Sequence, residues 1–186
     1  LRFGWVLWLA GWGLSGWGAA GGGAGARAAS EEVLRSVRQF RYELGERVQD
    51  PGTFLRRRRG DCDDFALYAR AALAKAGIRT RMVVVMMPAE THVVCHVPEA
   101  GIYLDFNRRS DPAGLVSTDG SLEDIARRVA GGFASPWLRV SCFVFQGARP
   151  VFLDTRYAGA PVFGRGAMGA VSAGGVEGVT GRAGGE

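Results

Sequence analysis

The sequence of 186 residues has few cysteines and only two histidines. Its three cysteines are odd in number and too few for a disulfide scaffold, so at least one thiol is free. The apolar run near the N-terminus, residues 3–10, is also short, because a membrane-spanning helix needs roughly 20 apolar residues. The few cysteines exclude a small disulfide-rich domain. Because the apolar run is short, we expect no stable membrane span.

Basic charge is in excess but is not arranged as in a nucleic-acid-binding protein. The net charge is +5, and the one basic block, residues 56–59, has no aromatic residues interleaved with it. We therefore expect no nucleic-acid partner, and the charge suits an anionic envelope or acidic substrates. The arginine block itself is typical of a solvated loop, with a substrate-facing role as the alternative.

Glycine is scarce in the middle of the chain and abundant at both ends. Nine of the 29 glycines precede residue 29 and ten follow residue 156. Residues 1–28 combine an early arginine, an apolar run and an A-x-A pattern at Ala26-Arg27-Ala28, which indicates a signal peptide or leader. We predict a domain over residues 29–156, a disordered tail over 157–186, and an exported, periplasmic or secreted protein. A disordered leader or a short anchor is the alternative for the first segment.

Two helices are predicted at the start of this domain. The first begins at its N-cap Ser30, and Asp50-Pro51-Gly52 ends it as a turn. Its apolar stripe consists of Val33, Val37, Phe40, Leu44 and Val48. The second spans residues 62–76, between the cap Asp61 and Gly77. Its buried face should carry Phe65, Ala69, Leu73 and Ala76, and Cys62 shares that face.

The rest of the domain favours strands. Residues 79–87, 91–97 and 101–106 have strand patterns, and Pro98-Glu99 forms the loop between the last two. A third helix fits residues 121–130, followed by strands over 137–145 and 151–153. Helices come first and a mostly antiparallel sheet follows, so the fold class is α+β.

Cys62 is the candidate nucleophile. Attack on a carbonyl carbon requires a thiolate, and the unpaired N–H groups and the dipole of a helix start favour that anion. Gly60 permits a tight turn before the cysteine. The carboxylates of Asp61, Asp63 and Asp64 oppose the anion, so an imidazolium must lie close by. A small apolar residue packed under the sheet is the alternative for this cysteine.

The hairpin predicts which histidine assists. A two-residue loop would pair Val97 with Ala100, and would therefore place His92 opposite Asp105 and His96 opposite Gly101. Opposed residues have Cβ atoms about 5 Å apart on one face. Only His92 then has a carboxylate that can orient its ring. The inference depends on register, because a slip of one residue would move Asp105 to the other face.

A zinc site formed by His92, Cys95 and His96 is rejected on geometry. The two histidines would lie about 13 Å apart along a strand at roughly 3.3 Å per residue, and Cys95 would point to the opposite face. Zinc ligands must lie about 2.0–2.3 Å from one ion. We expect no metal and no organic cofactor. Cys95 and Cys142 are interpreted as core residues, with a disulfide between them left open.

Three segments together resemble the transglutaminase-like superfamily, and most closely its bacterial cysteine proteinases. The first runs from Gly60 to Ala66 (GDCDDFA) and leads into a helix that ends at AGI, residues 76–78. The others are HVV at 92–94 and YLDFN at 103–107. The resemblance spans about residues 38–109. It implies a papain-like core, in which a helix with the nucleophile packs on an antiparallel sheet.

The resemblance implies a triad of Cys62, His92 and Asp105. These proteins often carry a tryptophan upstream of the cysteine, but the segment between Tyr42 and Cys62 has none. Tyr42 is therefore the candidate second oxyanion donor beside the backbone N–H of Cys62.

The expected activity is that of a cysteine protease or amidase. It would act through a thioester on a peptide or protein substrate, and a substrate of the cell envelope, such as peptidoglycan peptides, would suit the basic charge. A cross-linking transglutaminase and a non-catalytic envelope binding or scaffolding module are the alternatives.

Overall fold

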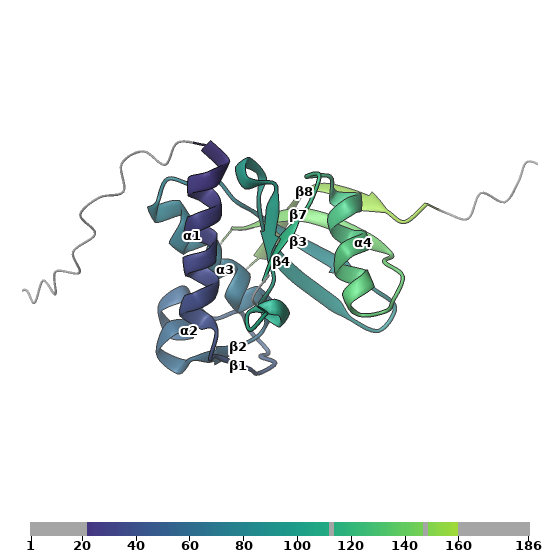
Figure 1. Ribbon diagram of the computed structural model, residues 1–186. Coiled ribbons are helices and arrows are strands. Elements are labelled where there is room, and N and C mark those ends of the chain that lie inside the picture. Colours follow the sequence, from purple (N-terminus) through teal and green to yellow (C-terminus); the bar gives the residue numbers. More distant parts are fainter. Residues whose placement is uncertain (1–21, 112–113, 147–148, 160–186) are drawn as a thin grey trace, which may run out of the picture.

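The computed structural model describes residues 22–111, 114–146 and 149–159, and its centre is a six-stranded antiparallel sheet (Figure 1). The strand order is β6-β5-β4-β3-β7-β8. The strands are β3 (Arg81–Met86), β4 (Thr91–Val97), β5 (Ile102–Leu104), β6 (Leu115–Ser117), β7 (Arg139–Gln146) and β8 (Arg149–Tyr157). A separate parallel pair joins β1 (Arg41–Tyr42) to β2 (Arg59–Gly60). The α+β prediction is confirmed.

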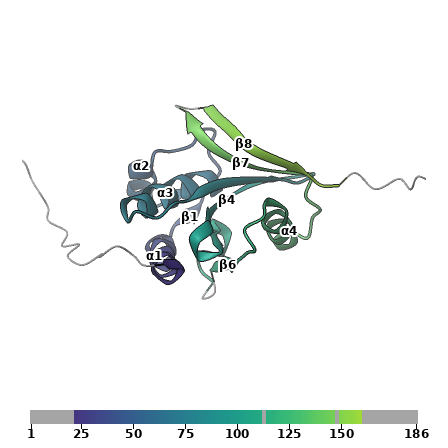
Figure 2. The ribbon, with the colours of Figure 1, turned by 90° about the horizontal axis from the view of Figure 1, so that it is seen from above.

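Helices lie on both faces of the sheet. Figure 2 shows α1, α2 and α3 on one side and α4 on the other. Their bounds are α1 (Gly22–Val37), α2 (Pro51–Arg57), α3 (Cys62–Lys75) and α4 (Leu122–Gly132), and two single 3₁₀ turns are η1 (Pro98–Ala100) and η2 (Phe106–Arg108). Side chains of a strand alternate between faces, so β4 serves both layers. Val93, Cys95 and Val97 pack on the side of α1 and α3, whereas Val94 packs on the side of α4.

The first predicted helix is wrong at both ends. Ser30 is not a cap: it lies within α1, and its hydroxyl donates to the carbonyl of Ala26 at 2.7 Å. The helix ends at Val37, and Leu44 is 80% exposed. The chain leaves the helix because tertiary contacts compete with the stripe. Phe40 packs against Phe54 at 5.3 Å, and the next two residues pair with β2.

The predicted turn at Asp50-Pro51-Gly52 is the start of a helix. Asp50 is the N-cap of α2, and its side chain accepts from the N–H of Thr53 at 3.0 Å. Proline is suited to the first helical position because that N–H has no partner in a helix. The helix ends at Arg58, which adopts the left-handed conformation with φ 53°.

The remaining elements follow the predictions with shifted ends. β8 is longer than expected and ends at Tyr157, where the predicted tail begins; residues 160–186 lie outside the described residues. β6 was not predicted. Ser121 caps α4 by accepting from the N–H of Asp124.

The predicted leader boundary at residue 28 falls inside α1. Residues 22–28 belong to the first turns of this helix, and Ala26 is buried in the core. Residues 1–21 lie outside the described residues, so the leader stays a prediction. Within the described ranges, no helix has both the length and the apolar character needed to cross a membrane.

Candidate active site

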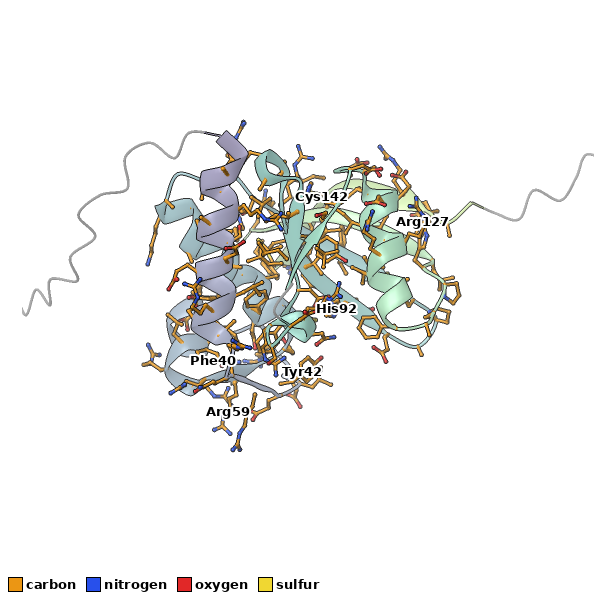
Figure 3. The ribbon with its side chains drawn as sticks, viewed as in Figure 1. Phe40, Tyr42, Arg59, His92, Arg127 and Cys142 are labelled. Carbon is orange, nitrogen blue, oxygen red and sulfur yellow. The ribbon has the colours of Figure 1, made fainter. Side chains whose placement is uncertain are left out.

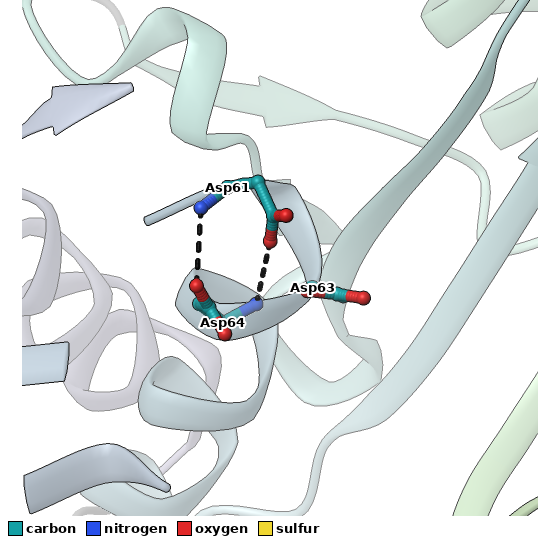
Figure 4. A group of neighbouring side chains, drawn as sticks. All are labelled: Asp61, Asp63 and Asp64. Atoms are coloured by element: carbon teal, nitrogen blue, oxygen red, sulfur yellow. Dashed lines mark hydrogen bonds between the residues drawn. The ribbon is translucent and has the colours of Figure 1, made fainter. Parts of the chain in front are cut away.

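Cys62 is the first residue of α3, as predicted. Asp61 caps the helix, and a reciprocal pair of hydrogen bonds joins Asp61 and Asp64, each side chain accepting from the backbone N–H of the other (Figure 4). This capping box fixes where the helix begins. Gly60 has no room for a side chain, because a Cβ there would lie 2.3 Å from a carboxylate oxygen of Asp64. The local sequence therefore holds Cys62 at the helix start.

The predicted register of the hairpin is wrong by two residues. Val97 pairs with Ile102, and His96 pairs with Tyr103 rather than with Gly101. The connection is not a two-residue loop but the turn η1 followed by Gly101 at φ 59°, a conformation that favours glycine. Because the shift is even, every side chain keeps its face. Asp105 follows β5 directly and remains on the side of His92.

His92 and Asp105 form a buried pair. Nε2 of His92 lies 2.8 Å from Oδ1 of Asp105, and the same oxygen accepts from the backbone N–H of Asn107 at 2.9 Å. This contact engages Nε2 and not Nδ1, and Cys62 is the second side chain that acts on the ring through a hydrogen bond. The ring also packs edge-on against Phe133 at 5.1 Å, a neighbour that the strand pattern did not reveal.

The charge of His92 is governed by these partners. Burial alone would lower the pKa of His92, but hydrogen bonds with Asp105 and Cys62 and their negative charges outweigh burial and raise it to about 10. The ring is then an imidazolium at neutral pH. Cys62, His92 and Asp105 are 8%, 2% and 5% exposed, so the structure brings the three predicted residues together in a largely buried site.

The other candidate residues lie apart from this group. His96 is 1% exposed, and within the described residues neither ring nitrogen has a hydrogen-bond partner. Burial lowers the pKa of His96 to about 4, and the charge of Arg81 acts in the same direction. Cys95 and Cys142 are both free and buried, and they lie on opposite faces of the sheet, so the open question of a disulfide is answered.

A cluster of carboxylates surrounds the start of α3. Oxygen atoms of Asp61, Asp63 and Asp64 lie within 4.8 Å of one another, and Figure 4 shows Asp63 pointing away from Asp64. Burial raises the pKa of Asp63 to about 8, and a hydrogen bond with Asp61 and the charges of Asp61 and Asp64 act in the same direction. Asp63 therefore keeps its proton at neutral pH, which reduces the negative charge beside Cys62. Sequence reasoning counted this residue as charged.

Among the residues that the structure describes, this cluster is the one group of acidic, histidine or cysteine side chains that could hold a metal ion. Carboxylate oxygens are the ligands that Ca²⁺ and Mg²⁺ prefer, and Oδ1 of Asp63 is buried without a hydrogen-bond partner in the described residues. Asp61 and Asp64 are already engaged, since they accept from the backbone N–H groups of Gly45 and Gln49. These bonds tie the preceding loop to the helix start.

Tyr42 borders the site from β1. Its ring stacks on Phe106 at 6.3 Å, and the residue is 48% exposed. Burial, followed by the nearby charges of Cys62 and Asp61, raises the pKa of Tyr42. The charge of Cys62 therefore reaches the Tyr42 hydroxyl. This position is compatible with the predicted role of Tyr42 as the second oxyanion donor.

Comparison with known proteins found similar solved structures and one matching family model. Solved structures of LapG from Legionella pneumophila are similar: one has 20% identity and a TM-score of 0.41, covering 59% of this chain and 76% of LapG. Its calcium-bound form has 16% identity and a TM-score of 0.45, covering 73% of each chain. No curated protein matches by sequence. The family model "Transglutaminase-like superfamily" matches residues 19–111, a segment that carries α3, β4 and Asp105. The chain therefore belongs to the transglutaminase-like superfamily.

Proposed function

We propose that the chain is a cysteine protease or amidase that cleaves amide bonds of a peptide or protein substrate. Cys62 is the nucleophile, His92 the general base and acid, and Asp105 the carboxylate that orients the ring. The observation that carries the proposal is the position of His92, which is hydrogen-bonded to Asp105 at 2.8 Å and to Cys62. An imidazole between a thiol and a carboxylate is the arrangement that nucleophilic catalysis by cysteine requires.

The reaction follows from these positions. In the resting pair the proton lies on His92 and Cys62 is the thiolate, which adds to the amide carbonyl to form a tetrahedral oxyanion. The backbone N–H of Cys62 at the helix start and the hydroxyl of Tyr42 are the proposed oxyanion donors. The C–N bond then breaks, the amine leaves with the proton from His92, and a thioester remains. Water loses a proton to His92 and attacks the thioester, which releases the acid and restores the thiol.

The acceptor of the thioester decides the class of enzyme. Water completes hydrolysis, whereas a primary amine would complete transamidation, as in a cross-linking transglutaminase. We favour water because it is the default acceptor of a thioester. Adding a primary amine at increasing concentration to a cleavage reaction separates hydrolysis from transamidation. In transamidation the thioester would give an amide in place of the acid.

A divalent cation is compatible with the acidic cluster. The LapG structure with calcium shows that a relative binds this ion. In this chain Asp61, Asp63 and Asp64 would hold it, and Oδ1 of Asp63, which no described residue engages in a hydrogen bond, offers a ligand position. The bound charge would neutralise carboxylates beside Cys62. The proposed proton transfers and covalent steps use only residues of the chain.

Covalent trapping tests the proposal. An acyl-donor probe should attach to Cys62, as located by mass spectrometry, and iodoacetamide should label Cys62 rapidly at pH 6. Cys95 and Cys142 are internal controls, because burial raises both pKa values, that of Cys95 to about 12, and neither should react. Cys62→Ala should lose all activity and keep the circular dichroism spectrum of the folded protein. A folded protein whose Cys62 accepts no probe would instead be a non-catalytic module of the same fold.

We also propose that the protein is exported and acts in the periplasm or outside the cell. The support is the leader pattern of residues 1–28. Cell fractionation followed by N-terminal mass spectrometry tests it. A mature N-terminus after Ala28 would mean that the first turns of α1 are lost, whereas one upstream of Gly22 would leave the helix whole.

A further inference from the structure

A basic hollow lies beside the proposed active site. Four arginines line it, and we name them the arginine surface: Arg41, Arg57, Arg58 and Arg59. The hollow has a volume of about 400 Å³ and is also lined by Gln39, Tyr42 and Glu43. All four arginines are exposed. Three arginines of the block that the sequence indicated as a solvated loop therefore line one concave site together with Arg41 of β1.

The arginine surface is close to Cys62 along two routes. Arg59 precedes Cys62 by three residues, which span at most about 10 Å of extended chain. Tyr42 lines the hollow and also interacts with Cys62. In Figure 3, Tyr42 lies between Arg59 and His92. A peptide held at Cys62 in an extended conformation would therefore reach the arginines about three residues from its scissile bond.

The positive charge of this surface is only partly compensated. Glu43 pairs with Arg57 at 2.8 Å and with Arg59 at 3.2 Å. Arg41 and Arg58 form no ion pair within the described residues. One glutamate against four arginines leaves three positive charges in excess. These charges face a hollow in which a carboxylate could accept hydrogen bonds from more than one guanidinium.

The backbone of Arg58 is strained because a residue with a side chain occupies the left-handed end of α2. Arg58 ends α2 in the left-handed conformation, φ 53° and ψ 35°, where glycine is usual and a side chain is unfavourable. Its guanidinium lies over the ring of Phe40 at 5.6 Å, so the side chain is held in place. Strain of this kind is typical of functional positions, and Arg58 is one of the residues that line the hollow.

We propose that the arginine surface binds acidic side chains of the substrate, two to four residues from the scissile bond. The substrate class is then a peptide segment with aspartate or glutamate at that distance. The inference rests on the proposed function, which supplies the scissile bond. Asp61 and Asp64 beside Cys62 would repel an acidic residue at the bond itself, so the preference should be confined to the distance at which the arginines lie.

Cleavage of a peptide library tests the position of the preference. Wild-type protein should cleave peptides enriched in Asp or Glu two to four residues from the cut, on one side of it. For the best acidic peptide, Arg41→Gln/Arg58→Gln should lower kcat/KM about tenfold, chiefly through KM, as expected for two exposed charge pairs. The matched control is Arg79→Gln/Arg149→Gln, which removes two exposed arginines elsewhere. Equal cleavage of Glu and Gln versions of the peptide, or an equal loss in the control, would overturn the inference.

Binding without turnover separates this inference from the proposed function. Anisotropy of a labelled acidic peptide on Cys62→Ala should show binding that weakens in 0.5 M salt and is at least severalfold weaker for the Gln version. If the acidic peptide binds but the wild type never cleaves it, the function fails and the surface stands. If peptides are cleaved with no acidic preference and none binds better, the surface fails and the function stands. Equally tight binding of an oligonucleotide would also overturn the proposal.

Arg58→Gly gives a readout that a purely structural arginine would not. Glycine fits the left-handed cap, so the melting temperature should rise or stay equal, whereas affinity for the acidic peptide should fall. Arg58→Lys keeps the charge and should retain part of the affinity. Unchanged affinity in Arg58→Gly would show that the strained arginine has no part in binding.

Discussion

The two ends of β4 carry the two histidines of the chain, and they differ in almost everything except burial. His92 lies at the start of the strand with Asp105 and Cys62 as hydrogen-bond partners. His96 lies four residues later on the same face, opposite Tyr103, and has no hydrogen-bond partner within the described residues. Both are almost fully buried, at 2% and 1% exposure.

The difference teaches that burial does not by itself determine the charge of a histidine. Burial favours the neutral ring at both positions, and at His96 it lowers the pKa to about 4. At His92 two partners reverse the effect and raise the pKa to about 10. One strand thus holds one cationic and one neutral imidazole at pH 7. The partners, not the strand, distinguish the proposed catalytic residue from a core residue.

The largest effect is expected from removing each histidine in turn. His92→Ala should lower turnover by at least about 10³-fold, since it removes the group that exchanges protons with the thiol. His96→Ala should keep turnover within a few fold of the wild type. Its free energy of unfolding should fall by about 2 kcal/mol, because the substitution leaves a cavity in the core. Steady-state rates and urea unfolding of both variants measure this. A dead His96→Ala beside an active His92→Ala would reverse the comparison and break the triad.

Asp105→Asn tests the partner that raises the pKa of His92. The amide keeps its oxygen, so it can still accept from the backbone N–H of Asn107, but it lacks the charge that stabilises the imidazolium. Turnover should fall by about 10²- to 10⁴-fold, as wrong tautomers do in serine triads. The NMR titration of His92 should move to lower pH, while that of His96 stays unchanged. A His92 titration that does not move would mean that Asp105 is not its partner in solution.

Elements with strong local signals were predictable from the sequence. α3 and β4 were placed to within one residue, because Asp61 and Asp64 form a capping box and the valines of β4 have a strand pattern. The end of the first helix was not predictable. The apolar stripe continues past Val37, but the packing of Phe40 on Phe54 favours a chain that leaves the helix there. Competition between local pattern and tertiary contact is not visible in one sequence.

The contact between His92 and Asp105 was predictable from the sequence, but its geometry was not. His92 and Asp105 were paired through a register that is wrong by two, and they still meet because an even shift preserves the face. Whether residues 98–100 form a two-residue loop or a 3₁₀ turn depends on small local energies. The proton of Asp63 depends on burial, which requires the fold. The arginine surface required β1 to lie beside β2.

A smaller effect should appear at alkaline pH, at the start of α3. Asp63 has a pKa of about 8, so it gains a negative charge next to Cys62 as pH rises past that value. We expect kcat/KM to fall severalfold between pH 7 and pH 9, and Asp63→Asn, which stays neutral, to lack this decline. The pH profiles of both proteins measure it. Identical profiles would show that the charge of Asp63 does not reach the site.

The smallest expected effect is at the other end of the strand, in His96→Leu. Leucine has a volume close to that of histidine and has no buried nitrogen to satisfy. Burying an unpaired polar group costs about 1–3 kcal/mol, so His96→Leu should raise the free energy of unfolding by about 1 kcal/mol at pH 7. Its rate of turnover should match the wild type. A less stable His96→Leu would mean that the ring has a hydrogen-bond partner in solution.

The pH dependence of stability then separates the two histidines by sign. The pKa of His96 is lowered from 6.5 to about 4, so its contribution is present above pH 6.5 and is lost as pH falls toward 4, when the unfolded chain takes up a proton that the folded chain resists. The pKa of His92 is raised from 6.5 to about 10, so its contribution is complete below pH 6.5 and is lost as pH rises toward 10. Urea unfolding at pH 4.5, 7 and 9.5 should therefore show less acid destabilisation in His96→Leu and less alkaline destabilisation in His92→Ala. If both variants reduce the destabilisation at the same pH extreme, the two ends of β4 have the same electrostatic environment. The reason for assigning the catalytic role to His92 rather than His96 is then lost.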